Sequence, residues 1–457
     1  MCAVNAGERL ARFVAETGGV PDDAILQAKR CVLDTLGVAL AGSREESARA
    51  VAGWLREQGG RPEAVALGCA LRLPVADAAL ANGTAAHALD FDDVSLPMRG
   101  HPSAPLLPAV LALGEAAGTS GRDLLVAFVL GFEVEAKLGR AIGGPHYALG
   151  WHATSTLGTL GAAAACARLL RLNTGRTQMA LGIATSLASG LQQNFGSMTK
   201  PLHAGWAARS GVVAAHLAAR GFSAGAEALT GPSGFLRAMS GGPEPDLTPF
   251  GALGEPFEIV SPGVGVKLYP CCYATHRAID AVLELRAAHD AAPADVAEVR
   301  VEVNRGGLLP LRVEPPTTGL EGKFSLEYCL AAALVDGGVG LSSFTDEAIR
   351  RPEARKLMSR VRVDEGEEAA EFPIGGYAEV RIALRDGGEY VTRVDVPRGD
   401  PSRPLSWDDL AAKFRDCAGA ALPAGGVDGV LRLIEGLDGL EDVSRLTEAL
   451  SVAETRA

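Results

Sequence analysis

A run of acidic residues followed by a histidine is the first feature that could do chemistry. Residues 88–93 read Ala-Leu-Asp-Phe-Asp-Asp, and Gly100-His101-Pro102-Ser103 follows shortly after. A carboxylate beside an imidazole fixes its tautomer and orientation, which a histidine acid or base needs. The same residues could instead form a solvated turn that caps the next helix, or hold a divalent cation. No second His or Glu motif of known metal spacing supports the cation.

A second histidine, His152, lies directly before a helix that is predicted to begin near Thr154. The N-terminus of a helix carries partial positive charge, which favours anions and lowers the pKa of a histidine. A neutral imidazole in this place could act as a general acid or base. The alternative is a histidine that only caps the helix.

A lysine, Lys200, stands immediately before a proline in the segment Met198–His203, and an Ala/Gly-rich helix follows. A single lysine is usually a solvated surface charge. Here the flanking residues are apolar and the helix has the composition of a buried one. The pattern therefore favours a lysine that is aimed at an anion.

The segment Gly263–Cys272 combines a Gly-x-Gly pattern, Lys267 and two adjacent cysteines. It follows no predicted strand and lacks the third glycine and distal acid of a dinucleotide fingerprint, so we reject a nucleotide site. Cys271 and Cys272 do not have zinc spacing. One of them could be a nucleophile, although a small buried residue is the more common role. Farther along, Tyr328 could pack in a core or point its hydroxyl into a cleft between domains.

A series of predicted helices must position these side chains. Apolar residues recur at helical spacing, and Gly-rich turns separate the segments. Small residues at every third or fourth position of 154–170, such as Gly158 and Gly161, indicate close contact between helices. The predicted helices cover residues 24–41, 45–57, 75–89, 104–117, 121–142, 154–170, 174–191 and 204–220.

The pattern changes near residue 256, where strands begin to alternate with helices. Val296–Val303 alternates apolar and charged residues, which is typical of a half-buried strand. Tyr377–Leu384 and Tyr390–Val396 flank a Gly-rich turn and predict a β-hairpin. Ser359–Val363 is a candidate fourth strand, and helices are predicted over 273–289 and 323–335. Together they predict a small α+β domain.

The C-terminal part is helical again. Ser406 is a candidate N-cap with acidic residues in the first turn of a helix over 406–419, and a second helix is predicted over 426–450. We therefore predict a mainly α fold. A large all-helical domain is made from both chain ends (1–262 and 403–457), and an α+β lid domain with an antiparallel sheet (263–402) is inserted in it.

Composition excludes several classes of protein. Of the 457 residues 47% are hydrophobic and 21% charged, which is typical of a folded globular chain. The net charge of -12 argues against a nucleic-acid or anionic-membrane partner but not against a small anionic substrate. The N-terminus lacks the pattern of a signal peptide, and the eight cysteines are scattered. We therefore expect a cytoplasmic protein with free thiols.

Six motifs in this order resemble the MmgE/PrpD family over nearly the whole chain. They read ALDFDD…HPS, HYALGWHATST, MTKPLHAGWAA, KLYPCCYATH, KFSLEYCLAAAL and PLSWDDL. Members of this family include 2-methylcitrate dehydratases, cis-aconitate decarboxylases and iminodisuccinate epimerases. The resemblance implies a helical domain built from both chain ends, an α+β lid and a homodimer.

The decarboxylase branch implies a set of site residues on matching positions of this chain. Two positions differ from that branch, since Val94 stands where it has threonine and Cys272, a candidate substrate contact, where it has histidine. Tyr147 is similar to a tyrosine of the epimerase branch. The implied site residues are Asp90, His101, His152, Lys200, Lys267 and Tyr328.

The resemblance implies proton transfer at a carbon next to a carboxylate of a small di- or tricarboxylate, without metal or organic cofactor. Lys200 and Lys267 would offset the developing negative charge. His101 and His152 would be the acid/base pair, oriented by Asp90, and Tyr147 or Tyr328 would deliver a proton. We expect a 2-methylcitrate dehydratase-like lyase or isomerase. The alternatives are an iminodisuccinate-type epimerase, a cis-aconitate decarboxylase-like enzyme, or a protein that binds a carboxylate without turnover.

Overall fold

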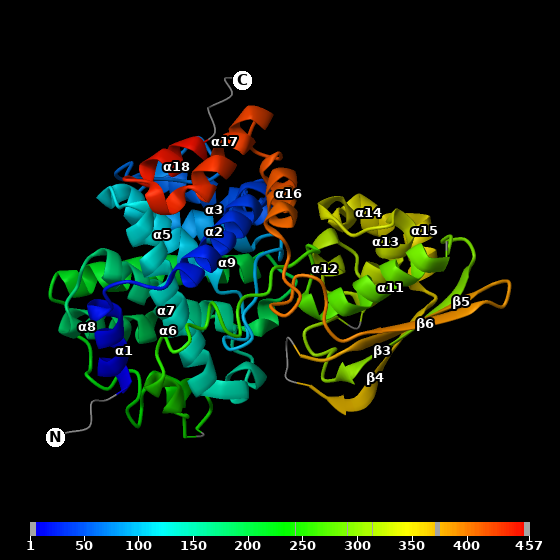
Figure 1. Cartoon of the computed structure of the whole chain (residues 1–457), viewed down its shortest axis with the longest axis horizontal. Coiled ribbons are helices and arrows are strands. Elements are labelled where there is room, and N and C mark those ends of the chain that lie inside the picture. Colours follow the sequence, from blue (N-terminus) through cyan, green and yellow to red (C-terminus); the bar gives the residue numbers. More distant parts are fainter. Residues whose placement is uncertain (1–5, 243, 290, 313, 371–374, 452–457) are drawn as a thin grey trace. The chain divides into compact units, whose positions relative to one another are not determined.

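The computed structural model describes residues 6–242, 244–289, 291–312, 314–370 and 375–451. The chain separates into two compact units (Figure 1). One consists of Met1–Val264 with Ser406–Ala457, and the other of Gly265–Leu405. The chain therefore leaves the first unit once and returns to it near its C-terminus.

The first unit is built from helices, which confirms the mainly α fold class. One short antiparallel pair, β1 (Ala64–Val65) with β2 (Arg72–Leu73), was not expected. Two-residue strands are too short to show an alternating pattern in a sequence. The helices are α1 Ala6–Glu16, α2 Asp22–Gly42, α3 Glu46–Gln58, α4 Val75–His87, α5 Ser103–Ala117, α6 Gly121–Ala148, α7 Ala153–Leu169, α8 Thr174–Leu187, α9 Thr199–Ala219, α10 Phe235–Met239, α16 Trp407–Ala418, α17 Ala424–Glu435 and α18 Ser444–Ala449.

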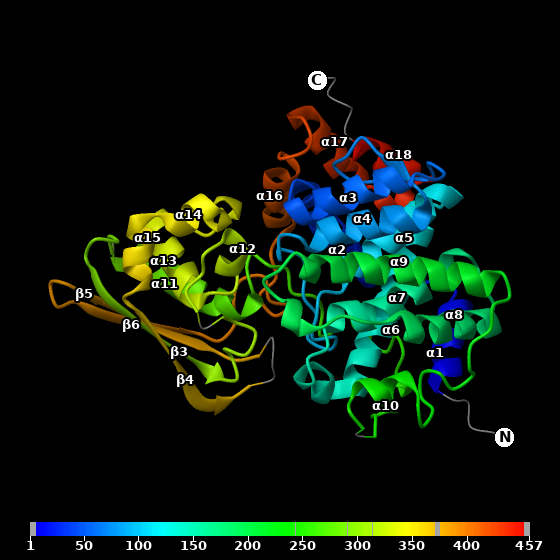
Figure 2. The ribbon, with the colours of Figure 1, turned by 180° about the vertical axis from the view of Figure 1, so that it is seen from behind.

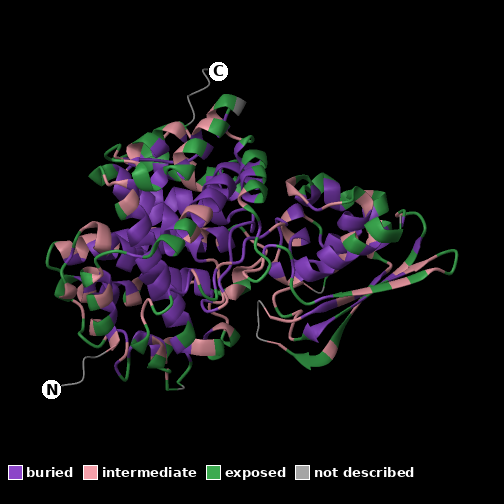
Figure 3. Ribbon diagram, viewed as in Figure 1, coloured by how far each residue is buried: buried purple, intermediate pink, exposed green. Residues whose placement is uncertain are grey.

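Glycines allow the central helices to lie very close together. A Cβ atom on Gly158 of α7 would lie 2.4 Å from Pro105 Cγ, and one on Gly161 would lie 2.5 Å from Glu135 Oε2. The small-residue pattern of 154–170 thus marks real helix contacts, and Figure 3 colours these helices as buried. Similarly, a Cβ on Gly205 would lie 2.3 Å from the Leu80 carbonyl oxygen, where α9 crosses α4 (Figure 2).

Several predicted helices have other bounds in the structure, and two of these differences change the interpretation. Helix α9 begins at Thr199 rather than at residue 204, so Lys200 lies in its first turn. Pro201 is tolerated there because the first N–H groups of a helix have no intrahelical acceptor. The single helix predicted over 426–450 is wrong, since α17 and α18 are separated by a turn that contains Gly436 and Gly439. Glycine is a poor helix former and favours such breaks.

The second unit is a four-stranded sheet with helices. The strands are β3 Val296–Arg305, β4 Val361–Ala369, β5 Ala378–Leu384 and β6 Glu389–Val394, in the order β4-β3-β5-β6. The β5–β6 hairpin is as predicted. The sheet is mixed rather than antiparallel, because β3 pairs with β4 in parallel. The long helical connection between β3 and β4 brings the chain back in the same direction, as a parallel pair requires.

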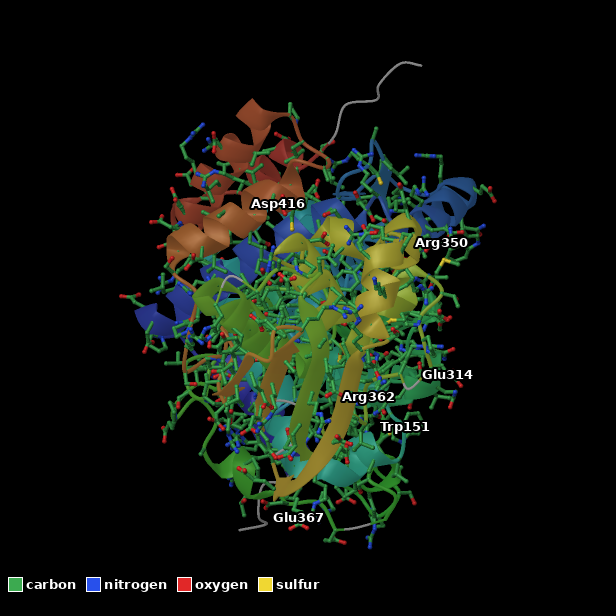
Figure 4. The ribbon with its side chains drawn as sticks, turned by 90° about the vertical axis from the view of Figure 1, so that its right-hand side faces the viewer. Trp151, Glu314, Arg350, Arg362, Glu367 and Asp416 are labelled. Atoms are coloured by element: carbon green, nitrogen blue, oxygen red, sulfur yellow. The ribbon has the colours of Figure 1, made fainter. Side chains whose placement is uncertain are left out.

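Helices α11 (His276–His289) and α13 (Leu326–Asp336) pack on this sheet. Ile279, Leu330 and Val380 belong to the shared apolar core. Strand β4 is an edge strand, and its exposed Arg362 and Glu367 are visible in Figure 4. Charged side chains on an edge discourage pairing with another chain. The remaining helices are α12 Gly319–Gly322, α14 Asp346–Arg350 and α15 Pro352–Met358.

The helices with the most apolar sequences owe that character to burial inside the protein. Every residue of α5 from Ser103 to Glu115 is buried, and so is nearly all of α7. Among the helices of the described residues, none has both the length and the apolar content that crossing a membrane requires.

Candidate active site

Four histidines from separate segments of the first unit meet in one buried cluster. His87 ends α4, His101 precedes α5, His152 precedes α7, and His203 lies in α9. The ring centroids of His87 and His101 are 4.7 Å apart, and those of His87 and His152 are 5.5 Å apart. The His152 and His203 centroids are 5.2 Å apart. The predicted His101 and His152 therefore lie in one cluster, together with two histidines that were not predicted.

Asp92 lies against two of these imidazoles. Its Oδ2 atom lies 2.7 Å from Nδ1 of His87 and 3.3 Å from Nδ1 of His101. Nδ1 of His101 also lies 2.9 Å from the carbonyl oxygen of Asp93. A carbonyl oxygen can only accept, so Nδ1 of His101 carries the proton and donates it. Neutral His101 then has its lone pair on Nε2.

Asp90, the predicted orienting carboxylate, forms an ion pair with Lys200. The Lys200 Nζ atom lies 2.5 Å from Asp90 Oδ1, while Nε2 of His101 lies 3.7 Å from the same oxygen. Asp90 and Lys200 are both buried, so Lys200 is not a solvated surface charge. The backbone φ of Asp90 is +53°, a left-handed conformation that non-glycine residues rarely adopt. Such strain is common at functional sites.

His152 is held in its neutral form. Burial lowers its pKa well below the ordinary value, and the positive charges of neighbouring groups, among them Lys200, lower it further. Its side chain makes no capping hydrogen bond to α7, which argues against a purely capping role. Instead, its Nδ1 atom lies 3.0 Å from Nδ1 of His203. Burial also lowers the pKa of His203, to about 4.

The end of α6 carries His146 and Tyr147 beyond a kink at Gly143. Nδ1 of His146 lies 3.0 Å from the Met239 carbonyl oxygen and Nε2 lies 2.8 Å from Thr156 Oγ1, so both nitrogens have structural partners. Burial lowers the pKa of His146 to about 4. Tyr147 is half-buried, and its carbonyl accepts from Gln192 Nε2 at 2.9 Å. The proton-donor role of Tyr147 stays a prediction.

The cluster also has the residue types of a metal site. His87, Asp90, Asp92 and His101 each offer one ligand atom, and these atoms lie within 4.8 Å of one another. Imidazole and carboxylate groups suit zinc and other divalent ions. However, the ammonium group of Lys200 already lies against Asp90, and it would repel a cation bound there. Chemistry without a metal therefore stays our prediction.

Three predicted site residues, Lys267, Cys272 and Tyr328, belong to the second unit. Lys267 is fully buried. The Tyr328 hydroxyl donates to the Ser343 carbonyl, and burial raises the pKa of Tyr328 to about 12. The backbone N–H of Cys272 donates to the Lys323 carbonyl at 2.9 Å, while its neighbour Cys271 is fully buried. The meeting of these residues with the histidine cluster stays a prediction.

Comparison with known proteins identifies the family. The MmgE/PrpD N-terminal domain matches residues 8–248, and the MmgE/PrpD C-terminal domain matches residues 269–435. The chain belongs to the MmgE/PrpD family. This confirms the resemblance and the expectation of an enzyme of the MmgE/PrpD type.

The MmgE/PrpD chain is similar to several curated proteins over almost all of its length. It is 33% identical to the cis-aconitate decarboxylase of Homo sapiens, over 95% of this chain and 92% of that protein. It is 32% identical to that of Mus musculus, over 94% and 89% of the two chains. It is 30% identical to the cis-aconitate decarboxylase of Aspergillus terreus, over 95% and 93%.

Sequence reasoning missed three residues of the cluster, namely His87, Asp92 and His203. His87 lies five residues before Asp92, in the motif that drew attention to Asp90. His203 lies three residues after Lys200, and residues at this spacing share a face once they are in one helix. Because α9 was predicted to begin at residue 204, this shared face was not recognised.

Proposed function

We propose that this MmgE/PrpD enzyme is a carboxy-lyase that releases CO2 from cis-aconitate or a closely similar unsaturated tricarboxylate. The similarity to cis-aconitate decarboxylases over 95% of the chain supports this choice among the reactions that the sequence left open. It favours the decarboxylase alternative over the dehydratase-like expectation. The reaction is proposed to need no metal ion or organic cofactor.

The observation that carries the proposal is a buried lysine beside a neutral histidine in one cluster. When the C–C bond to a carboxylate breaks, CO2 leaves and the electron pair must be stabilised and then protonated. Lys200, fixed against Asp90, supplies positive charge in a dry environment. His152 is neutral near pH 7 and delivers a proton to the carbon through Nε2. Lys267 of the second unit is proposed to bind a further carboxylate.

The direct test is an assay of the purified protein with cis-aconitate, 2-methylcitrate and iminodisuccinate. We expect CO2 release from cis-aconitate, and one deuterium atom in the product when the solvent is D2O. Lys200→Ala and His152→Ala should each lose a factor of about 10² or more in kcat. His216→Ala, a half-buried position farther along α9, is the matched control and should keep full activity.

Two other outcomes would replace this function by one of its alternatives. Loss of water from 2-methylcitrate without CO2 release from cis-aconitate would indicate a dehydratase. If citrate raised the melting temperature while all three acids stayed unchanged, the chain would be a binding protein.

We also propose that the enzyme is a cytoplasmic homodimer. The seven cysteines of the described residues are all free thiols, which supports a reducing compartment. Light scattering after size-exclusion chromatography should give twice the chain mass of 47.1 kDa. A monomeric mass at micromolar concentration would contradict the dimer.

A further inference from the structure

We infer that His203 is a positioning residue that exchanges a proton with His152 and so connects the buried acid/base to solvent. This inference rests on the proposed function, because it assigns His203 a part in the same reaction. It begins from one contact, the 3.0 Å distance between the two Nδ1 atoms. At this distance two ring nitrogens share a hydrogen bond, in which one donates and the other accepts.

The shared hydrogen bond ties the tautomers of the two rings together. If Nδ1 of His203 carries the proton, Nδ1 of His152 accepts, and a neutral His152 carries its own proton on Nε2. If the bond runs the other way, Nε2 of His152 holds the lone pair. Both rings are neutral near pH 7, so the two arrangements differ only in where the protons lie. A change at one ring therefore requires a change at the other.

The proton balance of the proposed reaction requires such a connection. Each CO2 that leaves is replaced on carbon by one proton from Nε2 of His152. As that proton leaves, the proton on Nδ1 of His203 moves to Nδ1 of His152, and Nε2 of His203 takes one proton from water at the same time. The hydroxide that remains combines with the released CO2 as bicarbonate. Both rings remain neutral before and after the transfer. After product release, water in the emptied site protonates Nε2 of His152, the proton on Nδ1 of His152 returns to Nδ1 of His203, and Nε2 of His203 gives its proton back to solvent, which restores the starting tautomers.

The burial of the two rings fits this direction of transfer. His152 exposes 2% of its surface and His203 exposes 8%. Within the described residues, the only side-chain hydrogen bond of either ring is the one between their Nδ1 atoms. Nε2 of His152 is thus available to the substrate, and Nε2 of His203 to water.

The groups around the pair work against storing a positive charge on it. His87 from α4 and Lys200 from α9 both lower the pKa of each ring, and His101 acts on His152 as well. Phe195 packs edge-on against His152, with ring centroids 4.9 Å apart. A protonated imidazole is therefore costly here. Transfer of a proton between the two rings therefore costs less free energy than holding a positive charge on either ring.

Substitution of His203 can separate proton transfer from simple packing. An asparagine can place an amide near the position of Nδ1, and so keep a hydrogen bond to His152, but it cannot exchange a proton. The hydroxyl of Ser155 donates to the backbone carbonyl of His203, so this contact survives any substitution. We expect His203→Asn to lower kcat by about 10² while KM changes by less than about threefold.

Chemical rescue gives the second activity measurement. Added imidazole should raise the kcat of His203→Ala by about tenfold or more, because a diffusible ring can replace the missing one. His216→Asn, on the same helix, should match the wild-type kcat with and without imidazole. Full kcat in His203→Asn would overturn the inference, since a hydrogen-bonding amide would then be sufficient. Absence of rescue in His203→Ala would also overturn it.

A measurement without substrate separates this inference from the proposed function. In protein labelled with 15N-histidine, NMR should detect coupling between the two Nδ1 nuclei across their hydrogen bond, and His203→Asn should abolish it. Absence of the coupling in the wild-type enzyme overturns the relay even if CO2 is released. Absence of CO2 release in the wild-type enzyme overturns the proposed function, whatever the NMR result.

Discussion

The ammonium group of Lys200 lies 2.5 Å from Asp90 Oδ1, and the two side chains keep only 7% and 4% of their surface exposed. Removing one partner of a buried ion pair leaves the other charge without compensation. We therefore expect Lys200→Met to lower the free energy of unfolding by about 3–5 kcal/mol. Urea denaturation followed by circular dichroism measures this difference.

A more exposed ion pair of the same residue types is the control for Lys200. Lys29 Nζ lies 2.8 Å from Asp438 Oδ1, with 15% and 40% of the side-chain surfaces exposed. Lys29→Met should cost less than about 1 kcal/mol. Adding Asp90→Asn to Lys200→Met should restore much of the lost stability, because the buried charge is then removed. If Lys29→Met and Lys200→Met lowered the free energy of unfolding equally, burial would not increase the cost of removing the lysine.

The close crossing of α4 and α9 gives a second prediction. A Cβ on Gly205 would lie 2.3 Å from both the Leu80 carbonyl oxygen and Thr84 Oγ1. Gly205→Ala should therefore destabilise the protein by about 1–3 kcal/mol and lower kcat, because α4 carries His87 and α9 carries Lys200. Thermal unfolding and the CO2 assay measure the two effects.

Gly53 in α3 is the matched control, since an added Cβ there has nothing within 4 Å. Alanine is the better helix former, so Gly53→Ala should raise stability by up to about 1 kcal/mol and leave kcat unchanged. If Gly205→Ala were as stable as Gly53→Ala, the close approach of α4 and α9 at Gly205 would be contradicted.

Much of this fold could be predicted from local patterns. Helical periodicity, glycine spacing and the Gly-rich turn after β5 are properties of short segments, and they indicated most of the longer helices and the β5–β6 hairpin. They missed α1 and the short helices α10, α12, α14 and α15. The parallel pairing of β3 with β4 could not be predicted in this way. It depends on how some 55 residues between the strands fold, and no short-range pattern encodes that path.

In the candidate site, too, short sequence patterns indicated some residues but not the contacts between distant segments. His101, His152 and Lys200 could be chosen because each stands at the boundary of a predicted element. Contacts between segments that are far apart in the sequence could not be predicted. One example is the pairing of Lys200 with Asp90, which are 110 positions apart. Asp92 lies closer to the rings of His87 and His101 than Asp90 does to His101, and the sequence could not show this because both carboxylates lie in one short run. The orienting role of Asp90 stays a prediction.

Removal of metal ions is expected to leave the activity unchanged. His87, Asp92 and His101 are possible ligands together with Asp90, but the ammonium group of Lys200 already balances the charge of Asp90. Dialysis against EDTA should therefore leave kcat for cis-aconitate within experimental error, and added Zn²⁺ or Mg²⁺ should not raise it. A loss of activity with EDTA that Zn²⁺ restores would instead assign the cluster to a metal.

Buried Asp93 should make stability fall as pH rises. Burial raises the pKa of Asp93 to about 7, and the charges of Asp34 and Asp92 add to this, although Ser103 donates to both carboxylate oxygens. Between the unfolded pKa of 3.8 and about pH 7, the folded state holds a proton that the unfolded state has lost. The contribution of Asp93 to the free energy of unfolding therefore decreases as the pH rises through this range. It falls by about 1.4 kcal/mol per pH unit and on the order of 4 kcal/mol in total.

Asp93→Asn should remove this dependence, because a neutral amide can make the same contacts with Ser103 as a protonated carboxyl. The substituted protein should resemble the wild type near pH 4 and become progressively more stable than it up to pH 7. Urea denaturation at several pH values measures the difference between the two curves. Asp416→Asn, at an exposed position on α16 (Figure 4), is the control and should leave the slope unchanged. If the curves of Asp93→Asn and wild type ran parallel, Asp93 would not take up a proton on folding.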